Sequence, residues 1–218
     1  LLSVIVKLKS RINVILDVGA LFIDGKNHEI AMTWLKLSDR TQIDYVIYFE
    51  NDFLVVCDRQ FRLHSFSTSP ANERLDRCLI YLDEVHTRGT DFKFPNHFQA
   101  VVTLGNGLTK DRFVQACMRM RRLGQSHSLI FWSSHEVHQQ ICSLTSNAQI
   151  QLKDILRWVY KNTQRAIWNG LHHWAMQSLS FQRKMNAFEK IQWTNVEQIF
   201  TDELMIELGE KCLETEII

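Results

Sequence analysis

The sequence predicts an α/β fold in which a parallel sheet of about six strands is flanked by helices and followed by an all-helical C-terminal extension. Up to about residue 141, short apolar runs alternate with amphipathic or polar stretches, which is typical of βαβ units whose sheet is buried on both faces. After about residue 146, apolar residues recur every three or four positions, as they do in amphipathic helices. We therefore expect two parts, residues 1–145 and residues 146–218.

The expected strands are the apolar runs of the first part, and helical periodicity appears between some of them. The helices are expected at Asn27–Leu37 and Lys110–Leu123. The strands are expected at Val14–Leu16, Tyr45–Phe49, Phe53–Cys57, Cys78–Leu82, Ala100–Leu104 and Ser128–Trp132.

The charge balance gives no protein-wide attraction to polyanions. Lysine and arginine number 25 and aspartate and glutamate 24, which leaves a net charge of +1. Such a balance does not support nucleic-acid binding. No stretch provides the roughly 20 apolar residues that a membrane-spanning helix needs, and the run Leu1–Val6 lacks the apolar core of a signal peptide. We expect no membrane partner.

The five cysteines are scattered and odd in number, without a CxxC pair. Free thiols of this kind favour a reducing compartment, so we expect an intracellular, cytoplasmic protein. The chain begins with leucine rather than methionine, and we expect it to be a piece of a longer protein.

The string Gln115-Ala-Cys-Met-Arg-Met-Arg-Arg-Leu-Gly-Gln125 is the first of two that suggest chemistry. It resembles the Gln-x-x-Gly-Arg-x-x-Arg-x-Gly-Gln helix on the second RecA-like lobe of superfamily 2 helicase-like ATPases, with Met118 in place of the usual glycine. On a helix, Gln115, Arg119 and Arg122 would share one face. The resemblance implies that the two arginines reach the phosphates of a nucleotide. A solvated basic helix face is the alternative.

The second string, Arg88-Gly-Thr-Asp91, follows an expected strand and precedes Gln115 by 24 residues. It resembles the Arg-Gly-x-Asp element of the same lobe, especially the version found in protein-translocating motors. Gly89 would let the backbone approach a phosphate or the partner lobe, and Asp91 would orient an arginine or a water molecule. We expect Arg88, Gly89 and Asp91 to face the nucleotide.

Just before this string, Asp83-Glu-Val-His86 spells a DExH box, whose acidic pair would hold Mg²⁺. The box requires an upstream P-loop, G-x-x-x-x-G-K-S/T, which the chain does not contain. We therefore interpret Asp83 and Glu84 as carboxylates at a strand end. No cofactor is expected in this piece alone, which should not hydrolyse ATP; ATP and Mg²⁺ would be held with the missing N-terminal RecA-like lobe of the same chain.

A thiol hydrolase is the second chemistry to consider. Cys117 lies among basic residues that would favour its thiolate. His86, oriented by Asp83 or Glu84, could act as its base. A buried cysteine that packs as a small hydrophobe is the alternative. The remaining histidines lack the spacing of metal ligands, and no metal site is expected.

A longer resemblance covers most of residues 13 to 141. It runs from Ile15-Leu-Asp-Val-Gly-Ala20 through Tyr81-Leu-Asp-Glu-Val-His-Thr-Arg-Gly-Thr-Asp91 and Thr103-Leu-Gly-Asn-Gly-Leu-Thr-Lys-Asp111 to Gln115-Ala-Cys-Met-Arg-Met-Arg-Arg-Leu-Gly124. The chain resembles the C-terminal region of very large eukaryotic proteins labelled ubiquitinyl hydrolase, or ubiquitin thiolesterase. That label implies cysteine-dependent cleavage at the C-terminus of ubiquitin, with ubiquitin as a partner. It assigns no nucleophile to a residue here.

Three hypotheses follow. The chain is the second lobe of an ATP-driven helicase or translocase, a segment of a thiol-dependent ubiquitin hydrolase, or a degenerate scaffold without catalysis. We favour the lobe for this piece and the hydrolase label for the longer protein.

Overall fold

A computed structural model describes residues 1–8, 10–23, 25–87, 92–145 and 149–193, the last seven of these without their side chains. Compact units are formed by residues 1–163 and 164–218. The boundary expected after residue 145 precedes this division, because Ile155, Trp158 and Val159 of the long helix α5 (Leu152–Trp193) are buried in the core of the first unit. Within the described residues, no helix is both long and apolar enough to cross a membrane.

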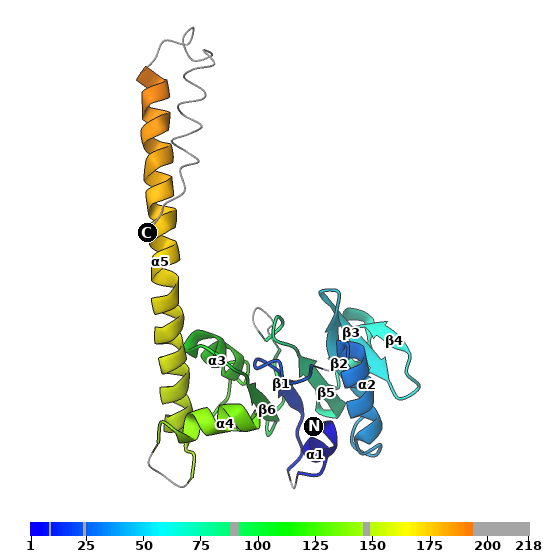
Figure 1. Ribbon diagram of the computed structural model, residues 1–218. Coiled ribbons are helices and arrows are strands. Elements are labelled where there is room, and N and C mark those ends of the chain that lie inside the picture. The colour runs from blue at the N-terminus through cyan, green and yellow to red at the C-terminus, as the bar shows by residue number, and fades with distance from the viewer. Residues whose placement is uncertain (9, 24, 88–91, 146–148, 194–218) are drawn as a thin grey trace. The chain divides into compact units, whose positions relative to one another are not determined.

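The first unit is built on a mixed sheet of seven strands in the order β4-β3-β2-β5-β1-β6-β7 (Figure 1). The strands β2, β5, β1, β6 and β7, which are neighbours in this order, are parallel. β3 pairs antiparallel with both β2 and β4. The strands are β1 (Val14–Leu16), β2 (Tyr45–Glu50), β3 (Phe53–Asp58), β4 (Leu63–Ser65), β5 (Cys78–Leu82), β6 (Gln99–Leu104) and β7 (Ser128–Ser133).

All six expected strands form, and β4 is added to them. The expectation of a wholly parallel sheet is wrong at the β2–β3 connection. Asn51 and Asp52 have φ angles of 48° and 64°, and two successive positive φ values define the tight turn of a β-hairpin. Such a turn reverses the chain, so β3 returns antiparallel to β2.

Helices cover both faces of the sheet. α1 (Leu2–Val6) and α2 (Asn27–Leu37) pack on one face, and α3 (Lys110–Cys117), α4 (His135–Cys142) and the start of α5 pack on the other. Alternation along the strands divides the core accordingly. In β1, for example, Ile15 belongs to the α2 side and Val14 and Leu16 to the α3 side.

The expected helix at Asn27–Leu37 is confirmed, but the second expected helix is too long. α3 ends at Cys117 rather than at Leu123. Beyond it, Arg119 and Met120 donate their amides to carbonyls three residues earlier, which gives a succession of turns. Gly124 then adopts a φ of 77°, a value that favours glycine.

Candidate functional site

The carboxyl ends of β1, β5 and β6 meet at one edge of the sheet, where ligands commonly bind in α/β proteins. Asp17, directly after β1, is only 2% exposed. Its carboxylate accepts hydrogen bonds from Thr103 Oγ1 at 2.7 Å and from the amide of Leu21 at 2.9 Å. Burial raises the pKa of Asp17, and these hydrogen bonds oppose that rise. Asp17 thus fixes the loop that leaves β1.

A second cluster at this edge surrounds Asp83, the first residue after β5. Asp83 Oδ1 lies 2.7 Å from His86 Nδ1 and accepts the His86 amide at 2.9 Å. Its other oxygen, Oδ2, accepts a hydrogen bond from Asn27 Nδ2 at 2.5 Å. Asp83 therefore contacts both the ring and the amide of His86, which is the contact that the expected orienting role would use.

The β2–β3 hairpin also contacts His86. The imidazole stacks on Phe49, with ring centroids 3.9 Å apart and planes 6° apart. His86 Nε2 lies 3.2 Å from Asp52 Oδ1 at the tip of the hairpin. One imidazole is thus held between a sheet-edge carboxylate and a hairpin carboxylate, an arrangement that can position a proton.

Glu84 has a different partner, because its carboxylate pairs with the guanidinium of Arg112 on α3. Arg112 also reaches the carbonyl oxygen of Val18 at 3.5 Å. The two neighbouring carboxylates therefore bind separate partners. Asp83 binds Asn27 and His86, and Glu84 binds Arg112. Among the described residues, no group of three or more metal-ligating side chains is assembled.

Arg119 links the two strings that the sequence singled out. Its Nε donates to the carbonyl oxygen of Thr87 at 2.8 Å. Thr87 is fully buried and precedes Arg88 directly. The expected phosphate-facing residues Arg88, Gly89 and Asp91 themselves lie outside the described residues. The contact shows that the arginine string lies against the backbone that enters the Arg-Gly-Thr-Asp string.

Arg122 contacts the connection between β5 and β6 near its other end, just before β6. Its guanidinium binds the side-chain oxygen of Asn96, and its amide donates to His127 Nδ1 at 3.2 Å. His127 Nε2 lies 3.0 Å from the carbonyl oxygen of Pro95. Asn96 and His127 precede β6 and β7, so Arg122 lies by the amino ends of these strands.

The shared helical face predicted for Gln115, Arg119 and Arg122 is wrong, because α3 ends at Cys117. Gln115 is exposed on α3, whereas the two arginines lie in the turns that follow. They contact the β5–β6 connection at Thr87 and at Asn96, on either side of residues 88–91. Within the described residues, the two arginines therefore contact the β5–β6 connection at separate points, Arg119 at Thr87 and Arg122 at Asn96.

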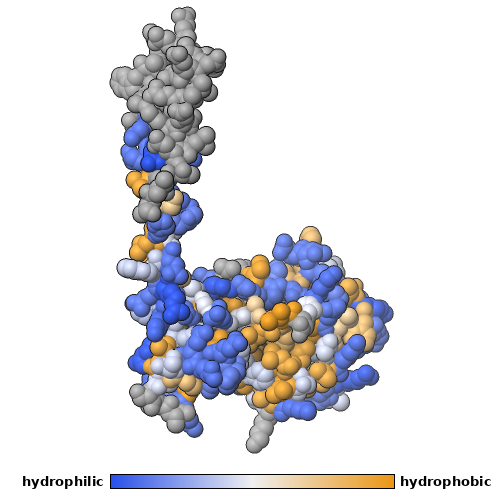
Figure 2. Space-filling model, viewed as in Figure 1, coloured by the Kyte–Doolittle hydropathy of each residue, from blue (hydrophilic) through white to orange (hydrophobic). Residues whose placement is uncertain are grey.

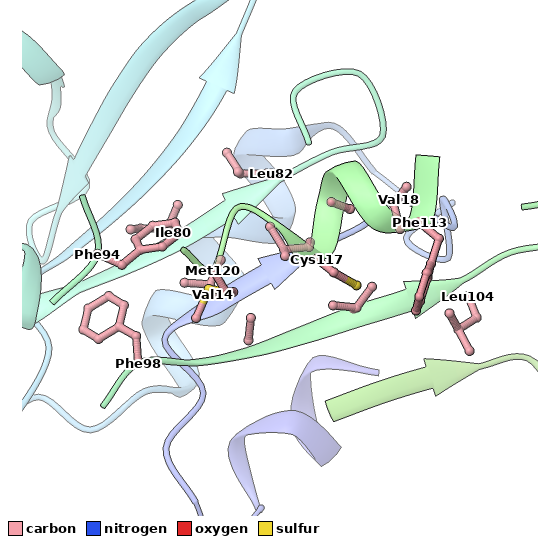
Figure 3. Packing of buried hydrophobic residues seen from close by; sticks show 14 of the residues in the cluster. Val14, Val18, Ile80, Leu82, Phe94, Phe98, Leu104, Phe113, Cys117 and Met120 are labelled. Carbon is pink, nitrogen blue, oxygen red and sulfur yellow. The ribbon is translucent and has the colours of Figure 1, made fainter. Parts of the chain in front are cut away.

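Cys117 does not have the surroundings of a nucleophile. It is 6% exposed and lies in the α3 side of the core, among Val14, Phe113 and Met120 (Figure 3). Burial raises the pKa of its thiol to about 12, which corrects the expectation that neighbouring arginines favour the thiolate. Cys117 instead packs in the core as a small hydrophobic residue, which was the alternative interpretation.

Sequence reasoning missed several residues of this edge. Asp52 and Phe49 belong to a hairpin that was expected to be two parallel strands, and Asn27 opens a helix distant in sequence. Only Asp17 carried a signal, since a carboxylate directly after a buried strand marks the ligand-binding edge of such sheets. Comparisons of the chain with family models, curated proteins and solved structures found no match.

Proposed function

We propose that this chain is the second, phosphate-sensing RecA-like lobe of a two-lobed ATPase within a larger protein. The nucleotide and Mg²⁺ would be held mainly by the first lobe, supplied by another part of the polypeptide. The observation that carries the proposal is the 2.8 Å hydrogen bond from Arg119 Nε to the Thr87 carbonyl. It joins the arginine string to the residue that directly precedes the Arg88–Asp91 string, and the order and spacing of the two strings suggested a nucleotide motor.

The carboxylates of Asp83 and Glu84 are already bound by other side chains. This supports a lobe that contacts the phosphates of a nucleotide held elsewhere, rather than one that holds the nucleotide and its Mg²⁺ itself. Glu84 is paired with Arg112, and Asp83 is bound by Asn27 and His86. The sequence of the first unit also has no P-loop. Phosphoryl transfer depends mostly on positioned positive charge, which this chain would supply through Arg119, next to the carboxyl end of β5.

For the longer protein we propose the activity implied by the family label, cysteine-dependent processing of ubiquitin conjugates. The burial and raised pKa of Cys117 argue that the nucleophile lies elsewhere in that protein. The Asp83–His86 pair, at 2.7 Å, supports a subordinate alternative in which His86 serves as a general base. A non-catalytic scaffold remains the third candidate.

ATP turnover by the longer protein, which would contain both lobes, tests the lobe proposal. We expect Arg119→Ala to lower kcat by roughly 10³-fold, the effect of losing an arginine that stabilises the transferring phosphoryl group. Arg122→Ala, at the amino ends of β6 and β7, should lower it far less. Arg157→Ala, at an exposed arginine of α5, is the matched control and should retain turnover. Wild-type turnover in Arg119→Ala would refute the sensing role.

A further inference from the structure

The part of α5 in the second unit carries a straight apolar stripe. Six positions from residue 167 to residue 185 follow one another at intervals of four, three, four, three and four residues. This spacing places them on one face of the helix. With a rise of 1.5 Å per residue, the stripe extends for roughly 27 Å. Its members are Ile167, Leu171, Trp174, Ser178, Phe181 and Met185.

The stripe is exposed although five of its six members are apolar. The exposed fractions of these five range from 42% for Met185 to 64% for Phe181. In Figure 2, hydrophobic residues interrupt the hydrophilic surface of this helix. Exposed apolar side chains aligned on one face of a helix are a feature of interaction sites. Alternating intervals of three and four residues are the heptad spacing by which a helix packs along another helix.

The stripe is also symmetric about Met176. In an antiparallel pair of these helices, Ile167 faces Met185 and Leu171 faces Phe181 of the second copy. Trp174 faces Ser178, so the largest side chain meets the smallest. One two-fold axis generates all of these contacts together, as a self-complementary interface requires.

The parallel arrangement lacks this complementarity. It would set Trp174 against Trp174 and Ser178 against Ser178, which overfills one layer and leaves space in the other. Charge does not oppose the antiparallel pair: Lys184 would flank Gly170, and Arg165 lies on the side of the helix away from the stripe. We propose that this face of α5 binds the same face of a second copy of the chain in an antiparallel two-stranded coiled coil.

Sedimentation of the full 218-residue chain tests the proposal. We expect a concentration-dependent dimer. Trp174→Ser leaves two small residues in a layer and Ser178→Trp places two large ones there, so each should weaken dimerisation at least tenfold. The double variant Trp174→Ser, Ser178→Trp restores one large and one small residue per layer and should regain affinity to within about threefold of the wild type.

Leu179→Ser is the matched control, since Leu179 is 49% exposed but lies off the stripe. It should dimerise like the wild type, and circular dichroism should show that every variant keeps its helix content. A wild-type chain that stays monomeric at 100 μM would overturn the proposal. So would single variants that dimerise normally, or a double variant that stays as weak as the single ones.

Cross-linking tests the antiparallel orientation separately. Ala175 lies beside the symmetry axis, so Ala175→Cys should be joined to its copy by a short bis-maleimide in a Cys142→Ser, Cys212→Ser background. In a parallel pair the two introduced cysteines lie on opposite flanks of the seam. A dimer that resists this cross-link contradicts the antiparallel pairing.

Discussion

The backbones of Gly19 and Gly105 touch where β1 and β6 leave the sheet. A Cβ atom on Gly19 would lie 2.3 Å from the amide nitrogen of Gly105, and one on Gly105 would lie 2.0 Å from the carbonyl oxygen of Gly19. Real Cβ atoms are not found so near backbone atoms, so the two loops can approach only as glycines. This contact closes the sheet edge on which Asp17 and Thr103 lie.

We therefore expect Gly19→Ala and Gly105→Ala each to lower the free energy of unfolding by about 3 kcal/mol, since backbone must move to admit the methyl group. Gly170→Ala is the control. Its Cβ would meet nothing closer than Trp174 atoms at 3.6 Å, and alanine in a helix interior should stabilise the protein by up to about 1 kcal/mol. Urea denaturation measures all three, and unchanged stability in the first two would contradict the contact.

The turn after β3 should make stability depend on acid pH through Asp58. Burial raises the pKa of this carboxyl, but hydrogen bonds from the Arg62 amide, His64 and other donors outweigh that effect and lower the pKa to about 2. A lowered folded-state pKa contributes stability above the ordinary value of 3.8 that is lost as the pH falls toward about 2. The contribution is about 2 kcal/mol.

Asp58→Asn should therefore cost about 2 kcal/mol at pH 7 and less than about 0.5 kcal/mol at pH 2. Chemical denaturation across this pH range measures the difference. If the curves of wild type and variant stay parallel throughout, the hydrogen bonds of Asp58 do not hold the turn.

Double-mutant cycles should separate the two carboxylates that flank His86. Asp83 and His86 are both largely buried, with side chains 21% and 16% exposed, so their coupling should be about 1 kcal/mol. Asp52 is 91% exposed, and its coupling with His86 should be smaller and vanish in 1 M salt. Alanine variants of the three residues provide the measurement. A stronger coupling for the Asp52 pair would reverse the assignment.

Thiol reactivity should follow burial. Cys142 is exposed, whereas Cys57, Cys78 and Cys117 are buried, and burial raises the pKa of each of these three thiols. In the native chain a maleimide should modify Cys142 at least a hundredfold faster than Cys117. A ubiquitin C-terminal electrophile should not label Cys117. Rapid labelling there, followed by mass spectrometry, would restore the thiol hydrolase interpretation for this piece.

Strand positions were predictable because the apolar runs are short and bounded by turn residues. The direction of β3 was not, because Asn51 and Asp52 had to be read as a hairpin turn rather than as an ordinary loop. The end of α3 was missed because Met118–Leu123 contains good helix formers, while tertiary contacts at Thr87 and Asn96 hold the arginines. A contact such as that of His86 with Asp52, 34 residues away, has no local sequence signal.

The binding of a transition-state analogue tests the central claim most directly. The claim is that Arg119, held at Thr87, stabilises a phosphoryl group on the partner lobe. In the longer protein, Arg119→Ala should weaken binding of ADP with aluminium fluoride by roughly 10³-fold and bind ADP alone like the wild type, because the arginine acts on charge that develops during transfer. Equal affinity of variant and wild type for the analogue would contradict the account.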